Sequence, residues 1–467
     1  MKLIPYTKTL VGDTETPITL YRKYVGDGCG MLLESCEQPK GRYSFIAADP
    51  MAVIRSKGES IVIEERGRLK VRQGKVLDAI RDFMEDYRVD NTTDIPFVGG
   101  LAGTVGYDVI RQYEKLPDTN ADDLGLPDAH LMAVTELIAY DHFSHRIILI
   151  ALEKGDEAGK ERADRKLKAM AQIIQKPCGL PAEKDELGKG VPEPVCNMTR
   201  EAFMDKVDRA RQYIHEGDIF QVVISQRWTI QTRRHPFTLY RRLRQVNPSV
   251  YMFYFNFGDY QVAGSSPEML VEVRGSQVRN CPIAGTRPRG ADAKEDERLA
   301  RELLADEKER AEHVMLVDLG RNDMGRIAEI GSVKVTEFMD IKRYSHVMHL
   351  ASLVEGRKRA DRDIFQVLAS FLPAGTLSGA PKIRAMEIIE ELEPGKRGIY
   401  GGAAGYFGFD GDMDMCIAIR TMVIHEGKAY LQAGAGIVAD SVPEREYEES
   451  RNKIRALIKA VEGDDKP

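Results

Sequence analysis

The segment from residue 281 to 323 constrains this chain more than any other, because a densely charged run in it leads directly into an apolar one. Glu309 and Glu312 stand three residues apart in the charged run, and on a helix this spacing places both carboxylates on one face. A solvated helix of mixed charge is the simplest interpretation of such a run. The apolar sequence HVMLVDL that follows predicts instead that the helix is partly buried, and buried carboxylates require a metal ion or another cation.

A second pair of carboxylates, Glu446 and Glu449, lies near the C-terminus. We predict a helix that begins after Ser441, with an apolar stripe on one face and the two glutamates with Lys453 on another. Carboxylates are hard oxygen ligands, and no His or Cys spacing typical of zinc accompanies them. The two pairs therefore favour Mg²⁺ over Zn²⁺.

Other residues predict what would bind beside the metal ion. Mg²⁺ usually holds substrate oxygens in addition to a few protein carboxylates. Arg420 and Lys453 offer a guanidinium and an ammonium group for a second anionic group. Gly434 and Gly436 allow a ligand to approach the backbone closely. Together they predict a small substrate that carries more than one negative charge.

The composition argues against several classes of protein. The chain has 67 basic and 73 acidic side chains, and this net charge of -6 argues against nucleic acid as the main partner. No apolar run approaches the ~20 residues needed to span a bilayer, and no apolar core of a secretory signal is visible. The six cysteines form no CxxC pair, which is typical of reduced thiols in a cytoplasmic protein.

The chain divides into two folded parts joined by a charged segment. Residues 1–153 are rich in short strand-like runs and form the N-terminal part. Residues 154–198 begin with a charged helix over 157–175 and continue with Pro, Gly, Lys and Glu, which predicts a linker or mobile surface segment. Residues 199–461 begin with a helix capped by Thr199 and form the second part.

Eight short motifs in the second part resemble those of the chorismate-binding enzyme family and occur in the same order. They are PIAGTRPRG, ERAEHVMLVDLGRND, RYSHVMHL, GTLSGAPKIRAMEII, YGGAAGYF, CIAIRT, QAGAGIVADSVP and EESRNK. The sequences LLES and GRYSF of the N-terminal part resemble the partner domain of the same family. The resemblance implies an α+β fold of two intertwined parts, with mostly antiparallel β-sheets and outer helices.

The resemblance also implies a reaction. In the anthranilate-forming branch, a lyase of tryptophan biosynthesis aminates chorismate at C2 with loss of the C4 hydroxyl, then eliminates pyruvate to aromatise the ring. The alternative is the aminodeoxychorismate-forming branch of the folate pathway, which usually has Lys where Ala284 stands and GGSxTGAP where this chain has GTLSGAP. Branches that use water, and a catalytically inactive chorismate-binding protein, are less well matched.

Site residues follow from the resemblance, motif by motif. Glu312 and Glu449 would hold Mg²⁺, which binds the ring carboxylate of chorismate. The substrate would be held by Gly285, Thr286, Tyr400, Arg420, Gly434, Ala435, Gly436 and Lys453. Glu309 is the candidate general acid for loss of the hydroxyl, His349 would handle a proton in the elimination, and Thr376 would line the site. A core histidine is the alternative interpretation of His349.

The chain needs a source of ammonia. A glutaminase of the Cys-His-Glu type has a His-x-Glu pair, and none of the nine histidines has Glu two residues on. We therefore predict a separate glutamine amidotransferase subunit and a hetero-oligomer.

The resemblance implies an effector site for tryptophan as well. In the family it lies between the LLES hairpin and the NPSxYM segment, which are Glu34 and Ser35 on one side and Val250, Tyr251 and Met252 on the other. Glu34 or nearby carbonyls would meet the ammonium group, and Met252 with its aromatic neighbours would form flat apolar walls. Val250 stands where the family typically has proline. Simple packing between the two parts of the chain is the alternative.

Overall fold

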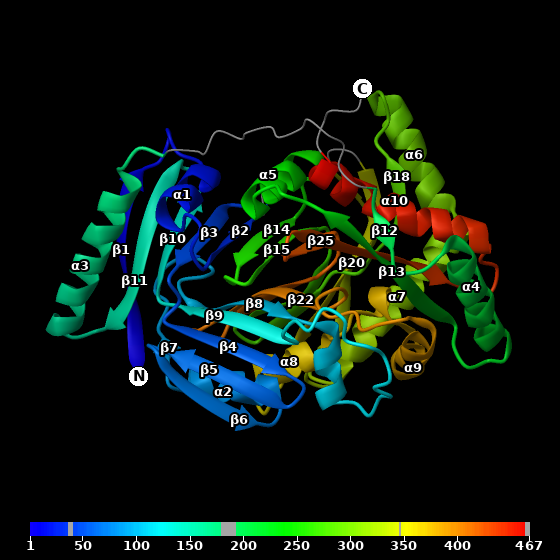
Figure 1. The fold of residues 1–467 in the computed structure, drawn as a ribbon, viewed down its shortest axis with the longest axis horizontal. Helices are drawn as coiled ribbons and strands as arrows, with labels where there is room; N and C mark the ends of the chain where they lie inside the picture. Colours follow the sequence, from blue (N-terminus) through cyan, green and yellow to red (C-terminus); the bar gives the residue numbers. More distant parts are fainter. Residues whose placement is uncertain (36–40, 179–192, 345–346, 463–467) are drawn as a thin grey trace.

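A computed structural model describes residues 1–35, 41–178, 193–344 and 347–462 of the chain (Figure 1). Two large β-sheets, sheet A and sheet B, dominate these residues. Pairings between their strands are antiparallel, except for the short parallel contact of β1 with β7.

Sheet A joins strands from both parts of the chain. Its strand order is β12 (Val195–Cys196), β13 (Gln221–Gln231), β25 (Lys428–Ile437), β24 (Thr421–His425), β15 (Tyr260–Ser266), β14 (Tyr251–Asn256), β2 (Gly30–Glu34), β3 (Tyr43–Ala48), β10 (Glu136–Asp141), β11 (Arg146–Lys154), β1 (Lys2–Val11) and β7 (Arg88–Val89), with β21 (Gly379–Ala380) beside β13. The two parts meet where β14 pairs with β2, so that Met252 lies opposite Glu34.

Sheet B is built in the same way. Its strand order is β18 (Ile283–Pro288), β20 (Val347–Arg357), β17 (Gln277–Asn280), β16 (Met269–Arg274), β23 (Met413–Ile417), β22 (Ala403–Gly408), β8 (Gly100–Val105), β9 (Ala129–Val134), β4 (Ala52–Lys57), β5 (Ser60–Glu65) and β6 (Arg68–Gln73), with β19 (Lys334–Arg343) beside β20. Here the parts meet where β22 pairs with β8. Both sheets mix strands of the two parts, and the predicted intertwined α+β fold is confirmed.

The largest core cluster joins the two sheets, since Phe45 and Phe253 of sheet A belong to the same apolar cluster as Ala404 and Met415 of sheet B. The other face of sheet A is covered by α1 (Pro17–Tyr24), α3 (Glu157–Ile174), α5 (Pro236–Val246) and α10 (Pro443–Glu462). The remaining helical segments are α2 (Val76–Glu85), η1 (Tyr107–Gln112), α4 (Arg200–His215), α6 (Ala293–Ala305), α7 (Glu307–Gly325), α8 (Ile364–Phe371), η2 (Gly375–Leu377) and α9 (Lys382–Leu392).

Helix α3 packs against sheet A, so the segment 154–198 is not a linker throughout. The helix predicted over 157–175 is present, and it buries Ala163, Leu167 and Met170 in the cluster on the outer face of sheet A. This apolar stripe makes the first half of the segment part of the folded body. The Pro- and Gly-rich residues 179–192 lie outside the described residues.

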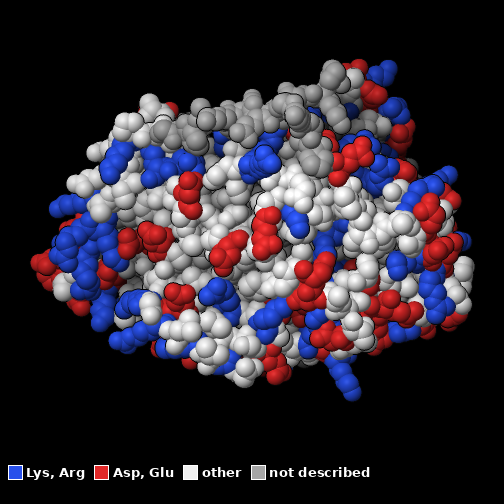
Figure 2. Space-filling view, in the orientation of Figure 1, with Lys and Arg blue, Asp and Glu red and all other residues white. Residues whose placement is uncertain are grey.

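The surface fits the mixed composition. Basic and acidic side chains are interspersed over the face in Figure 2, without one continuous basic surface on that face. None of the helices among the described residues is both long and apolar enough to cross a membrane.

Candidate active site

Helix α7 presents the first predicted carboxylates. The side chain of Asp306 accepts hydrogen bonds from the backbone N–H groups of Lys308 and Glu309, which fixes the first turn of the helix. Glu312 follows one turn later and is half-buried. Burial raises the pKa of Glu312, and the neighbouring Glu309 carboxylate raises it further.

Helix α10 brings the second pair to the same place. It begins at Pro443, as predicted, and the negative charge of its Glu449 also raises the pKa of Glu312. Lys453 lies between, with its Nζ 2.7 Å from Oε1 of Glu449 and 3.0 Å from the carbonyl oxygen of Gly434. Helices α7 and α10 therefore face each other beside strand β25.

These carboxylates suit a hard divalent cation. Within the described ranges, no three His, Cys, Asp or Glu side chains are gathered closely enough to hold a metal ion by themselves. Mg²⁺ is often bound by one or two carboxylates and completed by water and substrate oxygens, so a third protein ligand is not required. Oε1 of Gln221, whose Nε2 lies 3.5 Å from Glu312, is buried without a hydrogen-bond partner in the described structure. Two repelling carboxylates beside this unpartnered oxygen fit Mg²⁺.

Strands β18 and β20 hold His349 in one tautomer. Its Nδ1 lies 2.9 Å from the carbonyl oxygen of Gly285 and 3.0 Å from Oγ1 of Thr286. A carbonyl oxygen can only accept, so Nδ1 carries the hydrogen and Nε2 keeps its lone pair. Burial lowers the pKa of His349, and the charge of Arg420 lowers it further. His349 is therefore neutral at pH 7 and can accept a proton at Nε2.

Gly285 is required by both its backbone and its neighbours. Its φ of +62° lies in the left-handed region, and a Cβ there would come within 2.9 Å of Leu303 and 3.1 Å of Oε2 of Glu309. Glu309 in turn lies 3.2 Å from the guanidinium of Arg287. The Gly285–Thr286 segment and helix α7 therefore form adjoining walls.

Arg420 is positioned to bind an anion. Among the described residues its guanidinium has no carboxylate within ion-pair distance, although burial lowers its pKa. Its φ of 49° is unusual for a residue with a side chain, and such conformations concentrate at binding sites. Tyr400 lies beside it, and the hydroxyl of Tyr400 is hydrogen-bonded to the backbone of Gly434.

Strand β25 lines the site with its glycines. Gly436 packs against Gln221 so closely that a Cβ would lie 2.6 Å from the Nε2 of that side chain and 4.0 Å from Oε1 of Glu312. Ala435 points the other way, because its side chain belongs to the apolar cluster under α4 and α9. Only the backbone of Ala435 is left to contact a substrate, as strand alternation requires.

Glu268 was not singled out from the sequence and lies at the same site. This carboxyl group is 7% exposed, in the turn between β15 and β16. Burial raises the pKa of Glu268 to about 8, while the nearby hydroxyl of Thr376 and the charge of Lys453 act in the opposite direction. The Thr376 hydroxyl meets no partner of good hydrogen-bond geometry in the described structure, so it can turn toward a bound molecule. The sequence SSPEML gives no signal of this role.

The predicted effector residues line one cavity of about 520 Å³, which lies between the two sheets. Its walls include Glu34, Ser35, Val250, Tyr251 and Met252, together with the aromatic residues Tyr43, Phe45, Phe253 and Tyr406. Oε2 of Glu34 accepts hydrogen bonds from Tyr240 and Arg244, whereas its Oε1 is buried without a partner among the described residues. Since Glu34 pairs directly with Met252, its carboxylate lies on the face of sheet A that is covered by α5, and Oε1 is enclosed there.

Met252 borders the cavity, but its side chain is directed to the opposite face of sheet A. Its side chain is 1% exposed and packs in the cluster on the opposite face of sheet A, because neighbouring strand residues point to opposite faces. Tyr251 and Phe253 belong to the side that faces sheet B. The aromatic neighbours of Met252 therefore supply the flat apolar surface of the cavity.

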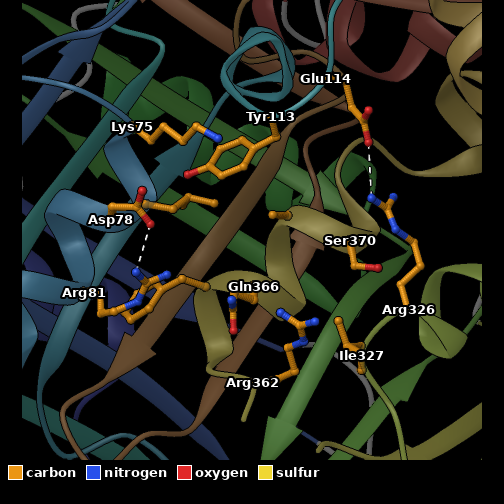
Figure 3. A pocket seen from close by; sticks show the side chains of 13 residues that line it. Lys75, Asp78, Arg81, Tyr113, Glu114, Arg326, Ile327, Arg362, Gln366 and Ser370 are labelled. Atoms are coloured by element: carbon orange, nitrogen blue, oxygen red, sulfur yellow. Dashed lines mark hydrogen bonds and ion pairs between the residues drawn. The ribbon is translucent and has the colours of Figure 1, made fainter.

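A third region, shown in Figure 3, lies apart from both of these sites. It is a cavity of about 430 Å³ between α2 and α8, and it shares no lining residue with the candidate active site or the effector cavity. Two of its cations already have partners, since Arg81 lies 2.9 Å from Asp78 and Arg326 lies 3.2 Å from Glu114.

Residues 30–459 match the family model described as chorismate binding enzyme. The chain belongs to this family. It is 48% identical to anthranilate synthase component 1 of Acetivibrio thermocellus, over 98% of this chain and 95% of that one. It is 46% identical to the protein of the same name from Thermus thermophilus, over 99% of this chain and 98% of that one.

Solved structures agree with this assignment to the chorismate binding enzymes. The crystal structure of anthranilate synthase component I from Streptococcus pneumoniae superposes with a TM-score of 0.81 at 38% identity, covering 96% of this chain and 99% of that one. The menaquinone-specific isochorismate synthase of Escherichia coli, at 20% identity and a TM-score of 0.72, shares the fold over 98% of this chain and 94% of its own.

Proposed function

We propose that this chorismate binding enzyme is the chorismate-converting subunit of an anthranilate synthase. The observation that carries the proposal is its similarity along nearly its whole length to proteins named anthranilate synthase component 1. The reaction is balanced as chorismate plus ammonia giving anthranilate, pyruvate and water. The aminodeoxychorismate alternative is not favoured, because the relatives described above carry the other name.

Substrate binding is proposed to use the cations and backbone of the site. Arg420 and Lys453 would hold carboxylates of chorismate, and Tyr400 with Gly434 would shape the wall beside them. Glu312 and Glu449 would hold Mg²⁺. The bound ion would neutralise the ring carboxylate and stabilise the charge that develops there. The mutual repulsion of these two glutamates supports this assignment.

The general acid is proposed to be Glu268 rather than Glu309. Amination forms the C2–N bond and breaks the C4–O bond, and hydroxide leaves only if it receives a proton and departs as water. Glu268 is protonated at neutral pH, since burial raises its pKa to about 8. Glu309 is already engaged by the guanidinium of Arg287, which lies 3.2 Å away.

His349 is proposed to act in the second half of the reaction. Elimination removes the proton at C2 and breaks the bond to the pyruvyl oxygen, which restores the aromatic ring. The lone pair at Nε2 is free to take the proton because Nδ1 is occupied by Gly285 and Thr286. Thr286 and Gly285 therefore orient His349 as well as bordering the substrate.

Ammonia is proposed to come from glutamine through a separate glutamine amidotransferase subunit, in a cytoplasmic hetero-oligomer. The designation component 1 of the relatives implies a further component. No His-x-Glu pair is present in the sequence to support glutamine hydrolysis by this chain.

The isolated chain is expected to form anthranilate from chorismate, Mg²⁺ and ammonium salt, and not from glutamine. The rate should increase between pH 7 and 9 as NH₃ replaces NH₄⁺, since only the neutral form is a nucleophile. Anthranilate fluorescence and mass spectrometry measure the product and would distinguish it from aminodeoxychorismate. Glutamine-dependent turnover by the pure chain would contradict the need for a partner, and an aminated product that keeps its pyruvyl group would favour the alternative.

We also propose that tryptophan binds in the 520 Å³ cavity and competes with chorismate. Backbone carbonyl oxygens of the segments that line the cavity would meet the ammonium group, and the aromatic walls suit the indole. The cavity is lined by Pro267 and Met269, which flank Glu268, so its occupancy can displace the general acid. A coupling of ~1–3 kcal/mol would weaken each ligand's binding roughly 5- to 150-fold in the presence of the other. Val250, without the fixed φ of proline, should make the inhibition softer.

Ser35→Leu is expected to raise the tryptophan concentration for half-inhibition by at least about tenfold and to leave uninhibited turnover within about twofold, because the added side chain fills the cavity without touching the active site. Inhibition curves and calorimetry measure both quantities. Ser276→Leu, at an exposed turn, is the matched control and should behave like the original protein. Unchanged tryptophan affinity in the Ser35 variant would argue against this cavity as the effector site.

A further inference from the structure

A buried ion pair lies behind the candidate active site. Arg397 and Glu393 are 3% and 4% exposed. Nε of Arg397 donates to Oε2 of Glu393 at 2.9 Å, and Nη2 donates to Oε1 at 2.5 Å. This bidentate geometry is the most directional that a guanidinium and a carboxylate can form.

The ion pair also makes hydrogen bonds to backbone groups of η2 and β13, which border the candidate active site. Nη1 of Arg397 donates to the carbonyl oxygen of Leu377, the residue after Thr376, at 2.5 Å. Nη2 also donates to the carbonyl oxygen of Val223 in β13, at 2.7 Å. Oε1 of Glu393 accepts from the backbone N–H of Ser225 at 2.7 Å. One ion pair thus ties η2 to β13, the strand that carries Gln221.

The same pair is connected to β25 and to Tyr400. The hydroxyl of Ser225 donates to Glu393 at 2.8 Å and accepts from the side chain of Gln432 in β25 at 2.8 Å. The guanidinium of Arg397 stacks over the ring of Tyr400, 5.7 Å from its centroid, and over Tyr107, 4.8 Å away. The ion pair is therefore connected to four parts of the active-site wall, which are η2, β13, β25 and Tyr400.

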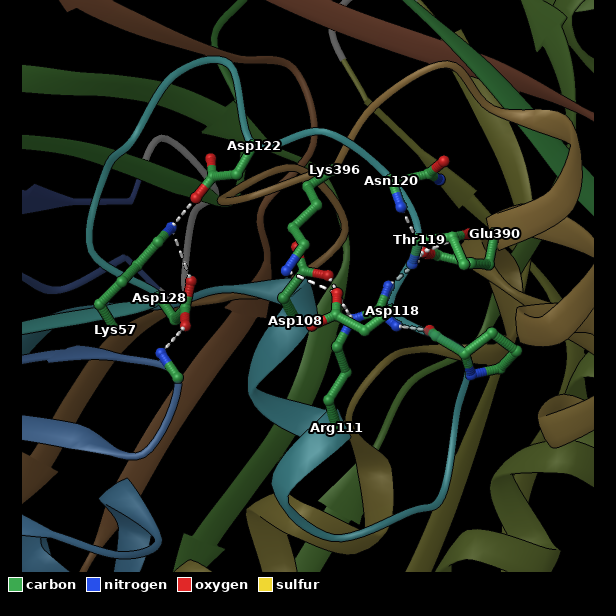
Figure 4. A network of polar contacts seen from close by, with 12 residues as sticks. Lys57, Asp108, Arg111, Asp118, Thr119, Asn120, Asp122, Asp128, Glu390 and Lys396 are labelled. Atoms are coloured by element: carbon green, nitrogen blue, oxygen red, sulfur yellow. Dashed lines mark hydrogen bonds and ion pairs between the residues drawn. The ribbon is translucent and has the colours of Figure 1, made fainter.

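The N-terminal part anchors the turn that carries Arg397, beside the polar network of Asp108, Arg111 and Glu390 in Figure 4. Gly398 donates its backbone N–H to Asp108 at 3.2 Å, and its carbonyl oxygen accepts from Tyr107 at 2.8 Å. Arg111 binds Asp108 at 2.8 Å and Glu390 at 2.5 Å. The turn from α9 to β22 is consequently fixed on its outer side.

We infer that Arg397, oriented by Glu393, is a positioning residue that fixes the relative positions of Thr376, Tyr400 and strand β13 around the substrate. A buried ion pair contributes little net stability compared with apolar packing, so stability alone gives weak reason for a charged pair here. The planar guanidinium makes four hydrogen bonds in fixed directions, and a lysine cannot reproduce them. Displacing catalytic groups by about 1 Å is enough to cost about a hundredfold in rate.

The test compares Arg397→Lys with Arg111→Lys in the full chain, and it rests on the proposed function. The Arg397 variant is expected to lose kcat about 10- to 100-fold while KM for chorismate changes less than about threefold, because Arg420 and Lys453 still bind the substrate. The basic limb of its pH–rate profile should also move, since Thr376 no longer lies beside Glu268 in the same way. Arg111→Lys makes the same exchange of guanidinium for ammonium in a part-buried ion pair, whose partners Asp108 and Glu390 are not among the proposed site residues, and its kcat should stay within about twofold.

Each outcome bears on one question. If the original protein makes no anthranilate from chorismate and ammonia, the proposed function fails and the inference fails with it. If the original protein is active, an Arg397→Lys variant with unchanged kcat and pH profile overturns the inference alone, as does an equal loss in Arg111→Lys. Should Arg397→Lys fail to fold, Glu393→Gln keeps the shape of the carboxylate partner and is expected to show the same loss of kcat with retained tryptophan binding.

Discussion

Glu268→Gln is expected to lower kcat for anthranilate formation by about a thousandfold while raising the stability of the folded chain at pH 8. The amide keeps the size of the side chain but cannot give a proton to the leaving hydroxyl, and removal of a general acid typically costs about 10²–10⁴ in rate. Glu309→Gln is the decisive comparison, because Glu309 is the alternative acid. A Glu309 variant that loses more activity than the Glu268 variant would reverse the assignment.

The effect of Glu268 on stability has a definite sign. The pKa of Glu268 is about 8 in the folded chain and 4.5 when the chain is unfolded. The folded chain therefore binds the proton more tightly, and folding is most favourable at low pH. Unfolding releases a proton between these two values, and stability is lost as the pH rises from 4.5 through about 8. At roughly 1.4 kcal/mol per pH unit, the loss by pH 7 is about 3 kcal/mol. Urea unfolding of the Gln variant should show a flatter dependence on pH across this window, and a parallel dependence would contradict the buried, protonated state.

The elements of the site could be predicted where local sequence determines them. Helix α10 begins at Pro443 as expected, and the three-residue spacing in α7 places Glu309 and Glu312 on one face of the helix. Both features depend only on residues that are close together in the sequence. The two-sheet architecture needed the family resemblance. Pairings such as β14 with β2 join residues more than 200 positions apart, and no periodicity encodes them.

The residues that sequence reasoning missed are those whose properties come from distant parts of the fold. Glu268 is an ordinary carboxylate in its own segment. Its pKa is raised by burial, and the residues that bury it are distant in the sequence. Arg397 lies in a charged stretch typical of a surface, yet it is enclosed by η2, β13 and a turn held by the N-terminal part. The direction of the Met252 side chain could not be predicted either, because it depends on strand register, which the pairing with Glu34 fixes only in three dimensions.

Glu312→Gln and Glu449→Gln are expected to abolish most turnover and to remove stabilisation of the chain by Mg²⁺. The two carboxylates repel each other, and a divalent cation relieves this repulsion, so each glutamate contributes charge as well as a ligand oxygen. A loss of roughly a thousandfold in kcat/KM would correspond to about 4 kcal/mol of lost transition-state stabilisation. Activity measured at several Mg²⁺ concentrations should show that added metal only partly restores the rate.

Binding of Mg²⁺ can be followed without turnover, because a ligand that binds only the folded chain stabilises it by about 2.7 kcal/mol at a hundred times its Kd. The melting temperature of the original chain should therefore rise with Mg²⁺, and that of the two variants should not. Glu448→Gln changes the exposed neighbour of Glu449 on α10 and should retain the full rise. If the Glu312 variant kept both the rise and a near-normal rate at limiting Mg²⁺, the metal would have to be bound elsewhere. The raised pKa of Glu312 would then reflect only its burial beside Glu309.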